Sequence, residues 1–247
     1  MARILITGSS DGLGLLAAKA LIDQRHQVVL HARNEGRAQE TRRRVPDCED
    51  VLIGDLASPE ETRALAAAAN ALGRMDAVIH NAGVYQASSQ EILAVNTLAP
   101  FILTCLIQQP HRLIYLSSSM HLQGDPSLKS ITSGKTTVRY SDSKLHMVLL
   151  AKAIARHWPG VFANAVDPGW VPTRMGGRGA PDDLAKGFET QVWLAVSGDD
   201  KARVSGRYFF HMQESRDHPA TDQPATQDAF LAVCEQVTGV GFPPDAP

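Results

Sequence analysis

Short, continuously apolar runs alternate along the chain with longer segments whose apolar residues recur at helical spacing. Runs that are apolar at every position, rather than at every second one, are typical of strands with helices over both faces of their sheet. Strands that alternate with crossover helices form right-handed βαβ units. The order therefore predicts an α/β fold with a doubly wound parallel sheet and helices on both faces. The strands are expected at 3–7, 27–31, 50–54, 76–80, 112–117 and 161–166, and the helices at 14–25, 59–72, 90–109 and 140–157.

The composition is that of an ordinary globular protein, with 44% hydrophobic and 20% charged residues. The net charge of −2 argues against a nucleic-acid binder, which carries a basic excess. The three cysteines are widely spaced, so they predict neither a disulfide framework nor a metal site and fit a reducing compartment. No apolar stretch approaches the roughly 20 residues of a membrane helix. We expect a cytoplasmic protein with no metal, no membrane and no nucleic-acid partner.

A glycine-rich turn, TGSSDGLG at 7–14, joins the first predicted strand to the first predicted helix. In doubly wound sheets ligands bind beyond the carboxyl ends of the strands, and a helix N-terminus there presents free N–H groups to a pyrophosphate. A side chain at Gly8, Gly12 or Gly14 would displace the phosphates or block the contact between helix and strand. A plain glycine turn is the alternative interpretation. The residues of this turn expected to bind a dinucleotide are Gly8, Ser9, Ser10, Gly12, Leu13 and Gly14.

The residue after the second predicted strand indicates the coenzyme. Arg33 stands where an acidic residue would bind the ribose hydroxyls of NAD, and an arginine at that position accommodates a 2′-phosphate instead. Arg37 follows one helical turn later. A solvated surface arginine is the alternative. We therefore expect NADP(H) to be the cofactor and NAD(H) to be less favoured.

Polar and small residues also follow the third and fourth predicted strands. Asp55, with Leu56 beside it, stands where an adenine amino group can be bound. Asn81, Ala82 and Gly83 follow the fourth strand, and the two small residues let the backbone approach a cofactor. Because the carboxyl ends of parallel strands meet at one edge of the sheet, we expect all five residues in the same dinucleotide site.

The strongest chemical signal is YSDSK at 140–144, which opens a predicted helix and places Tyr140 and Lys144 on one face. A phenol has an ordinary pKa near ~10, and a neighbouring ammonium is expected to lower that pKa. A helix face without chemistry is the alternative, since this spacing is frequent. Three serines, 117–119, follow the fifth strand, where a hydroxyl can donate to a substrate carbonyl oxygen or simply form a turn.

Taken together, these motifs resemble the short-chain dehydrogenase/reductase family over about residues 2–210. TGSSDGLG matches that family's T-G-x(3)-G-x-G turn, NAG at 81–83 its motif after the fourth strand, YSDSK its Y-x(3)-K, and DPGWVPT at 167–173 its P-G segment. The resemblance implies a single Rossmann-like domain and a nicotinamide-dependent oxidoreductase that interconverts a carbonyl and an alcohol. Arg33 and the lengthened segment 119–139 are similar to those of retinol dehydrogenases and protochlorophyllide reductases.

The resemblance also implies roles for individual residues. Tyr140 would be the general acid in reduction and the base in oxidation, while Lys144 would hold the nicotinamide ribose and tune the phenol. Ser118 aligns with the family's substrate-orienting serine, with Ser119 as an alternative. Asn96 matches a helix asparagine that supports a proton relay through the lysine. The residues expected at the nicotinamide end are Pro168, Gly169, Val171 and Thr173.

We expect one domain over 1–247, with a cofactor-binding half at about 1–115 and a catalytic and substrate half at about 116–247. The segment 119–139 is expected to line or cover the substrate side. Residues beyond 210 have no predicted role.

Family members often pair through helices like those at 90–108 and 140–157, which implies a homodimer or homotetramer acting on a small-molecule substrate. Asp11 departs from the pattern, because some NADP-using members carry a basic residue there. Two other functions stay open: an NAD(P)-binding regulator without turnover, which the same fold permits, and an epimerase or dehydratase that retains NAD. A regulator does not need the catalytic residues together, and Arg33 argues against the NAD-retaining enzyme.

Overall fold

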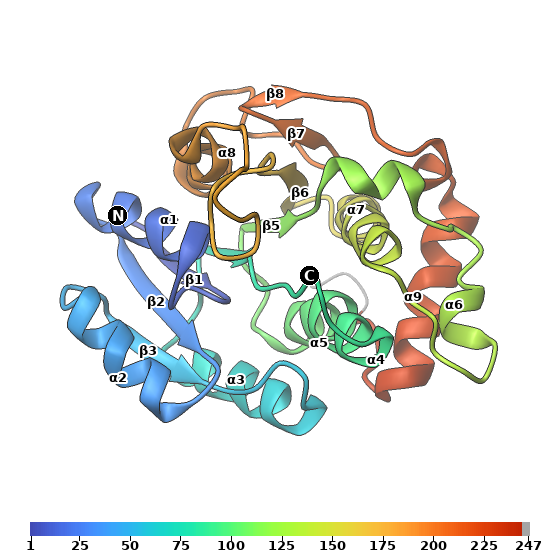
Figure 1. Ribbon diagram of the computed structural model, residues 1–247, viewed down its shortest axis with the longest axis horizontal. Coiled ribbons are helices and arrows are strands. Elements are labelled where there is room, and N and C mark those ends of the chain that lie inside the picture. The colour runs from blue at the N-terminus through green and yellow to red at the C-terminus, as the bar shows by residue number, and fades with distance from the viewer. Residues whose placement is uncertain (244–247) are drawn as a thin grey trace.

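The computed structural model, which describes residues 1–243, is one α/β domain built on an eight-stranded sheet (Figure 1). The strand order is β3-β2-β1-β4-β5-β6-β7-β8; β1 to β7 are parallel, and β8 runs antiparallel to β7. Successive strands are added outward in one direction from β1 to β3 and in the other from β4 onward. This reversal is the place where doubly wound sheets bind ligands. The predicted fold class is confirmed.

The six predicted strands form, and each of their ends lies within one residue of the expected position. A buried parallel strand is apolar at every position, so its limits are easy to read from the sequence. The observed strands are β1 Arg3–Ile6, β2 Gln27–Ala32, β3 Asp50–Ile53, β4 Ala77–His80, β5 Arg112–Leu116 and β6 Phe162–Asp167.

Two short strands at the edge of the sheet were not predicted. β7 (Tyr208–Phe210) and β8 (Gln213–Glu214) form a hairpin whose turn is made by His211 and Met212. Both turn residues have positive φ, 48° and 60°, a conformation that sequence patterns usually mark with Asn-Gly. The hairpin therefore lacks the sequence signal by which such turns are recognised.

Three predicted helices begin and end within two residues of expectation: α1 (Gly12–Asp23), α3 (Pro59–Ala71) and α7 (Tyr140–His157). Ser58 caps α3, since its side chain accepts the N–H of Glu61 at 3.2 Å and Pro59 occupies the first turn. Further helices are α2 Glu35–Arg44, α6 Lys129–Thr132, α8 Leu184–Val196 and α9 Pro224–Thr238, with 3₁₀ turns at Ser119–Gln123 and Pro219–Asp222.

The single helix predicted at 90–109 is divided. α4 (Ser89–Leu93) and α5 (Ala99–Leu106) are separated by a π-helical turn, Ala94–Leu98, and such turns are frequent at functional sites. The window Ser89–Leu106 has 18 residues and a mean hydropathy of 1.3, so by length and composition alone it is apolar enough to cross a membrane. This corrects the expectation that no stretch approaches that length. Since 67% of the window is buried inside the domain, core packing accounts for its composition.

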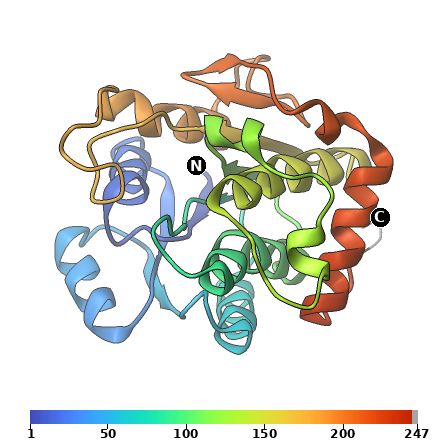
Figure 2. The same ribbon diagram turned by 45° about the vertical axis from the view of Figure 1, so that its right-hand side comes forward.

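Helices cover both faces of the sheet (Figures 1 and 2). α1 packs against α8 over one face, while α3 packs against α5, and α7 against α9, over the other. Side chains of one strand alternate between the two apolar clusters: Ile4 and Ile6 belong to the first, and Leu5 to the second. This alternation follows from the pleat of a strand.

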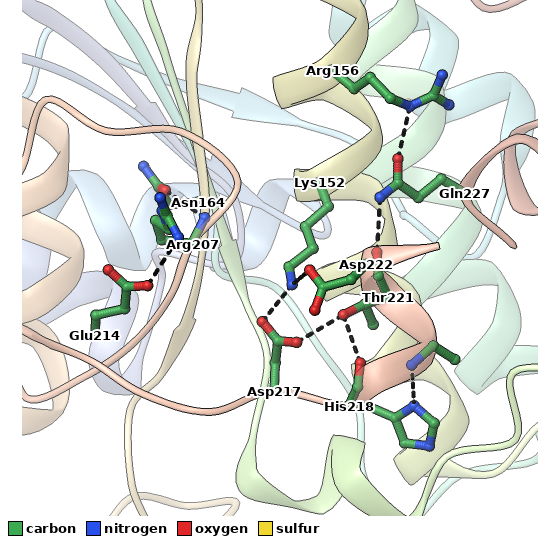
Figure 3. Close-up of polar contacts among 11 residues, drawn as sticks. Lys152, Arg156, Asn164, Arg207, Glu214, Asp217, His218, Thr221, Asp222 and Gln227 are labelled. Carbon is green, nitrogen blue, oxygen red and sulfur yellow. Dashed lines mark hydrogen bonds and ion pairs between the residues drawn. The ribbon is translucent and has the colours of Figure 1, made fainter. Parts of the chain in front are cut away.

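The C-terminal segment, which had no predicted role, packs against α7. The rings of His146 and Phe230 stack at 5.2 Å. Lys152 lies between Asp217 and Asp222, with its Nζ 2.7 and 2.6 Å from their carboxylate oxygens (Figure 3). Lys152 and Asp217 are each about nine-tenths buried, so removing either side chain would leave an uncompensated buried charge and destabilise the fold. α9 thus covers a face of the helix that was expected to pair with a second subunit; a homodimer or homotetramer stays a prediction.

Candidate active site

A cavity of about 670 Å³ lies at the carboxyl edge of the sheet, and this volume suits a small-molecule site. Its lining comes from the segments that follow β1 to β6 and from the start of α7. The predicted site residues on this lining are Gly8, Ser10, Gly12, Leu13, Arg33, Asp55, Leu56, Asn81, Ala82, Gly83, Tyr140, Lys144, Pro168 and Thr173. The predicted residues off the lining are Ser9, Gly14, Asn96, Ser118, Gly169 and Val171.

The glycine turn serves both packing and access. Gly8 has φ +63°, and a Cβ there would lie 2.8 Å from the Cα of Ala82. A Cβ at Gly14 would lie 2.4 Å from Nδ2 of Asn81. These two glycines let the turn and α1 approach the segment after β4. At Gly12 the atoms nearest an added Cβ are 3.9 Å away, so bare backbone at the N-terminus of α1 faces the cavity, as an anion-binding cradle requires.

His31, which the sequence analysis did not single out, holds the glycine turn from β2. Its Nδ1 accepts the N–H of Gly8 at 2.9 Å, and its Nε2–H donates to the carbonyl of Gly54 at 2.8 Å. Burial lowers the pKa of His31, which maintains this neutral tautomer. The hydroxyl of Ser9 accepts the N–H of His31 and donates to the carbonyl of Ile6, each at 2.8 Å. Ser9 therefore lies beneath the turn instead of on the cavity lining.

Three arginines gather beside the glycine turn. Arg37 and Arg44 each approach the carboxylate of Asp11 to 3.8 Å, and Arg44 donates to the carbonyl of Ser10 at 3.0 Å. Arg33 is exposed on the lining. Asp11, the residue that departs from the NADP pattern, is thus offset by two cations, and Arg33 adds positive charge to the cavity. Arg44 reaches the turn from the end of α2, a contact that no sequence spacing indicates.

The segment after β4 is fixed to β1 by Asn81. Its Nδ2 donates to the carbonyls of Thr7 and Gly8, at 3.0 and 3.1 Å. The hydroxyl of Thr7 accepts the N–H of Ala82 at 3.1 Å. These bonds explain why an asparagine precedes two small residues here: the side chain ties two strand ends together while the backbone faces the cavity.

Asn96 clamps this same segment onto the start of α7. Its Oδ1 accepts the N–H of Val84, and its Nδ2 donates to the carbonyl of Val84, both at 2.8 Å, and to the hydroxyl of Ser143 at 3.1 Å. Gly83 lies beside it, because a Cβ there would be 3.4 Å from the Asn96 Oδ1 and 3.5 Å from the Lys144 Nζ. The side chain of Asn96 therefore positions the cavity wall. The proton relay assigned to it stays a prediction.

Tyr140 and Lys144 share one face at the start of α7, as predicted. The Nζ of Lys144 lies 5.2 Å from the Tyr140 ring centroid and donates to the carbonyl of Leu116 at 2.9 Å. The ring of Tyr85, another residue that the sequence analysis missed, stands edge-on to Tyr140 at 4.8 Å. An acid–base group, a cation and an aromatic wall therefore meet in the cavity.

Burial controls the charge of this pair. Burial raises the pKa of Tyr140, and the charge of Asp167 raises that pKa further. In the protein without coenzyme the pKa of the phenol is therefore raised, not lowered, and Tyr140 is protonated at neutral pH. The tuning role assigned to Lys144 stays a prediction. Burial lowers the pKa of Lys144 to about 8, so its ammonium form still predominates at neutral pH. The site accordingly presents a proton donor beside a cation.

The three serines after β5 have different positions. The hydroxyl of Ser118 accepts the N–H of Met120 at 3.3 Å and caps the 3₁₀ turn, away from the cavity lining. Ser119 is exposed. Ser117 lines the cavity, and its hydroxyl donates to the carbonyl of Lys144 at 2.8 Å. Ser117 thus ties α7 to β5, and the substrate-orienting role assigned to Ser118 stays a prediction.

The segment 119–139 contributes no residue to the cavity lining, so it does not line this cavity. The expectation that it covers the substrate side stays a prediction. It packs on the start of α7 instead. A Cβ at Gly124 would lie 2.7 Å from Cβ of Leu145, and the N–H of Asp125 donates to the Asp142 carboxylate at 3.0 Å. The segment is therefore used to hold the helix that carries Tyr140.

Known proteins share this sequence pattern. The family model described as short chain dehydrogenase matches residues 2–183. An uncharacterized oxidoreductase of Emericella nidulans is 47% identical over 98% of this chain and 99% of its own length. The short-chain dehydrogenase chyC of Penicillium rubens is 42% identical over 98% of this chain and 100% of its own length. Retinol dehydrogenase 14 of Homo sapiens is 27% identical over 96% of this chain and 86% of its own length. This confirms the predicted likeness to retinol dehydrogenases.

Solved structures share the fold. A protein of Mycobacterium paratuberculosis superposes with a TM-score of 0.81 at 21% identity, over 98% of this chain and 95% of its own. A short chain dehydrogenase of Shigella flexneri, solved in complex with NADP, superposes with a TM-score of 0.67 at 24% identity. The match covers 86% of this chain and 97% of that protein.

Proposed function

The chain belongs to the short-chain dehydrogenase/reductase family of oxidoreductases that act on CH–OH groups, and from this premise we propose that it is an NADP(H)-dependent enzyme that interconverts a small carbonyl compound and the corresponding alcohol. One observation carries the proposal: Tyr140 and Lys144 line the same cavity as Gly12 and Arg33. An acid–base pair thus shares a cavity with the elements that recognise a phosphorylated dinucleotide. The expected coenzyme class in this family is NAD(P).

The residues of the cavity suit the two ends of the coenzyme. The open backbone at Gly12 and the N-terminus of α1 would hold the pyrophosphate. Arg33, with Arg37 behind it, would hold a 2′-phosphate through charge-assisted hydrogen bonds. In the strand order of the sheet, Arg33 follows β2 on one side of β1 and its glycine turn, and Lys144 bonds the end of β5 on the other side. Lys144 would therefore hold the nicotinamide ribose. The NADP complex of the Shigella flexneri relative supports this coenzyme.

Tyr140 supplies the proton. When bound, NADPH would supply a hydride to the substrate carbonyl carbon. The Tyr140 hydroxyl, which burial keeps protonated, donates its proton to the carbonyl oxygen as a general acid. The ammonium of Lys144, 5.2 Å from the ring, stabilises the phenolate that forms. In alcohol oxidation the phenolate takes the hydroxyl proton back.

Arg33→Ala is expected to remove most of a preference for NADP(H). A guanidinium bonded to a phosphate contributes enough for roughly tenfold or tighter binding of NADPH over NADH in the wild type. Affinities for both coenzymes are measured by fluorescence titration, and the variant should bind them about equally. Arg43→Ala is the matched control, because Arg43 is exposed on α2 and does not line the cavity. Equal affinities in the wild type would contradict the NADP assignment.

A further inference from the structure

Asp167 is a buried carboxylate, 6% exposed, at the carboxyl end of β6. Its Oδ1 accepts the N–H of Gly169 at 2.9 Å, and its Oδ2 accepts the hydroxyl of Tyr208 at 3.1 Å. Neither partner is a cation, and the ion pairs found among residues 1–243 do not include Asp167. A charge buried without a counter-ion is costly, and the chemistry proposed above gives this one no role.

The register of the sheet places Asp167 beside the strand end to which Lys144 is bonded. Val166 is the partner of Leu116 across β5 and β6, and the carbonyl of Leu116 accepts the Lys144 Nζ at 2.9 Å. Asp167 follows Val166 directly, so its backbone lies beside the point at which Lys144 ends. Lys144 and Asp167 are 5% and 6% exposed, and charges buried from solvent are screened less than exposed ones.

We propose that Asp167 is a positioning residue that holds Lys144 as an ammonium and Tyr140 as a phenol. The proposal rests on the proposed function and adds a direction to it. A fixed negative charge favours the cationic form of a lysine and opposes the anionic form of a tyrosine. Both effects keep the site in the state that donates a proton, which is the state that carbonyl reduction needs.

Two other titratable groups near Asp167, Tyr208 and His121, supply no positive charge at neutral pH. Burial raises the pKa of Tyr208, and the charge of Asp167 raises it further. Burial lowers the pKa of His121 in the 3₁₀ turn, so this ring is mostly neutral. The charge of Asp167 raises the pKa of Tyr140 in the same direction as burial, and it raises the pKa of Lys144 against the effect of burial. Of the groups that the charge of Asp167 affects, these two α7 side chains are the ones that line the cavity.

Asp167→Asn tests the charge with little change in shape, because the amide oxygen can still accept the N–H of Gly169. The pH dependence of alcohol oxidation reports the phenolate of Tyr140. Without the negative charge, the rising limb of this pH–rate profile should move to lower pH by about one unit. At a pH below the rising limb of both proteins, Asp167→Asn should therefore oxidise the alcohol about tenfold faster than the wild type. Asp182→Asn is the matched control: this carboxylate accepts the N–H of Trp170 on the same turn at 2.6 Å but is only half-buried. Its limb should stay in place.

A second measurement needs no turnover and separates this proposal from the proposed function. The pKa of Lys144 is measured by NMR titration of side-chain-labelled lysine in the protein without coenzyme. In the wild type it should be about 8, and Asp167→Asn should lower it. Tyr208→Phe, which removes the hydroxyl bonded to Asp167 and keeps the charge, should raise it. A lysine pKa that falls in Tyr208→Phe, or that Asp167→Asn leaves unchanged, would overturn the role of Asp167 even in an active enzyme.

Discussion

Tyr140→Phe should lower the turnover of carbonyl reduction by about 10²–10⁴-fold, which is the usual contribution of a positioned acid–base group. The substitution keeps the ring, and with it the edge-on contact with Tyr85 at 4.8 Å, so packing at the start of α7 should be preserved. NADPH affinity should persist, because Gly12 and Arg33 are the residues assigned to the other end of the coenzyme. Turnover is measured by coenzyme absorbance, and NADPH binding by titration of the same preparation.

Tyr85→Phe is the natural comparison for that result. It removes the hydroxyl of a second tyrosine on the same cavity lining, and we expect it to cost less than about tenfold in turnover, since Tyr85 is not assigned to proton transfer. Near-normal turnover in Tyr140→Phe, on any carbonyl compound that the wild type reduces, would show that the general acid is another group.

Lys144→Met should lower both turnover and coenzyme affinity. The buried ammonium is the cation nearest the Tyr140 ring among the described contacts, at 5.2 Å, and without it the developing phenolate loses its charge partner. We expect a loss of about 10²-fold or more in turnover, comparable with the removal of an electrostatic catalytic group. Weaker NADPH binding should accompany it, because the same ammonium is assigned to the nicotinamide ribose.

The contrast between the two variants separates the two roles of the lysine. Tyr140→Phe should change turnover alone, and Lys144→Met should change turnover and affinity together. The lost bond to the carbonyl of Leu116 also costs stability, so urea unfolding of both variants is the control for misfolding. A folded Lys144→Met protein with wild-type NADPH affinity would contradict the coenzyme role of Lys144.

The sheet and the motif residues were predictable because their signals are local. Parallel strands are apolar at every position, so β1 to β6 could be placed to within one residue. The spacing of Tyr140 and Lys144 fixes their common helix face without any tertiary information. The β7–β8 hairpin escaped prediction because its strands are short and His211 and Met212 replace the usual turn residues.

The rest of the site depends on contacts between distant parts of the chain. His31 meets the carbonyl of Gly54, and Ser117 meets that of Lys144, across 23 and 27 residues. No pattern within either segment marks such pairs. The protonation of Tyr140 is a similar case, since the sequence shows the neighbouring lysine but not the burial that raises the pKa of the phenol. Local spacing therefore singled out Tyr140 and Lys144 as the proposed catalytic pair, and only the fold could show the burial that governs their protonation.

The central claim, reversible hydride exchange between NADP(H) and a carbonyl compound, is tested most directly with deuterium. Purified wild-type protein is incubated with NADPH that carries deuterium at the transferable position of the nicotinamide, together with a panel of carbonyl compounds. We expect deuterium on the carbinol carbon of the alcohol product, in an amount equal to the NADP⁺ formed, and much slower transfer from labelled NADH. Failure to transfer the label to any carbonyl compound, or protein that retains unexchanged NAD while converting substrate without net coenzyme oxidation, would contradict the claim.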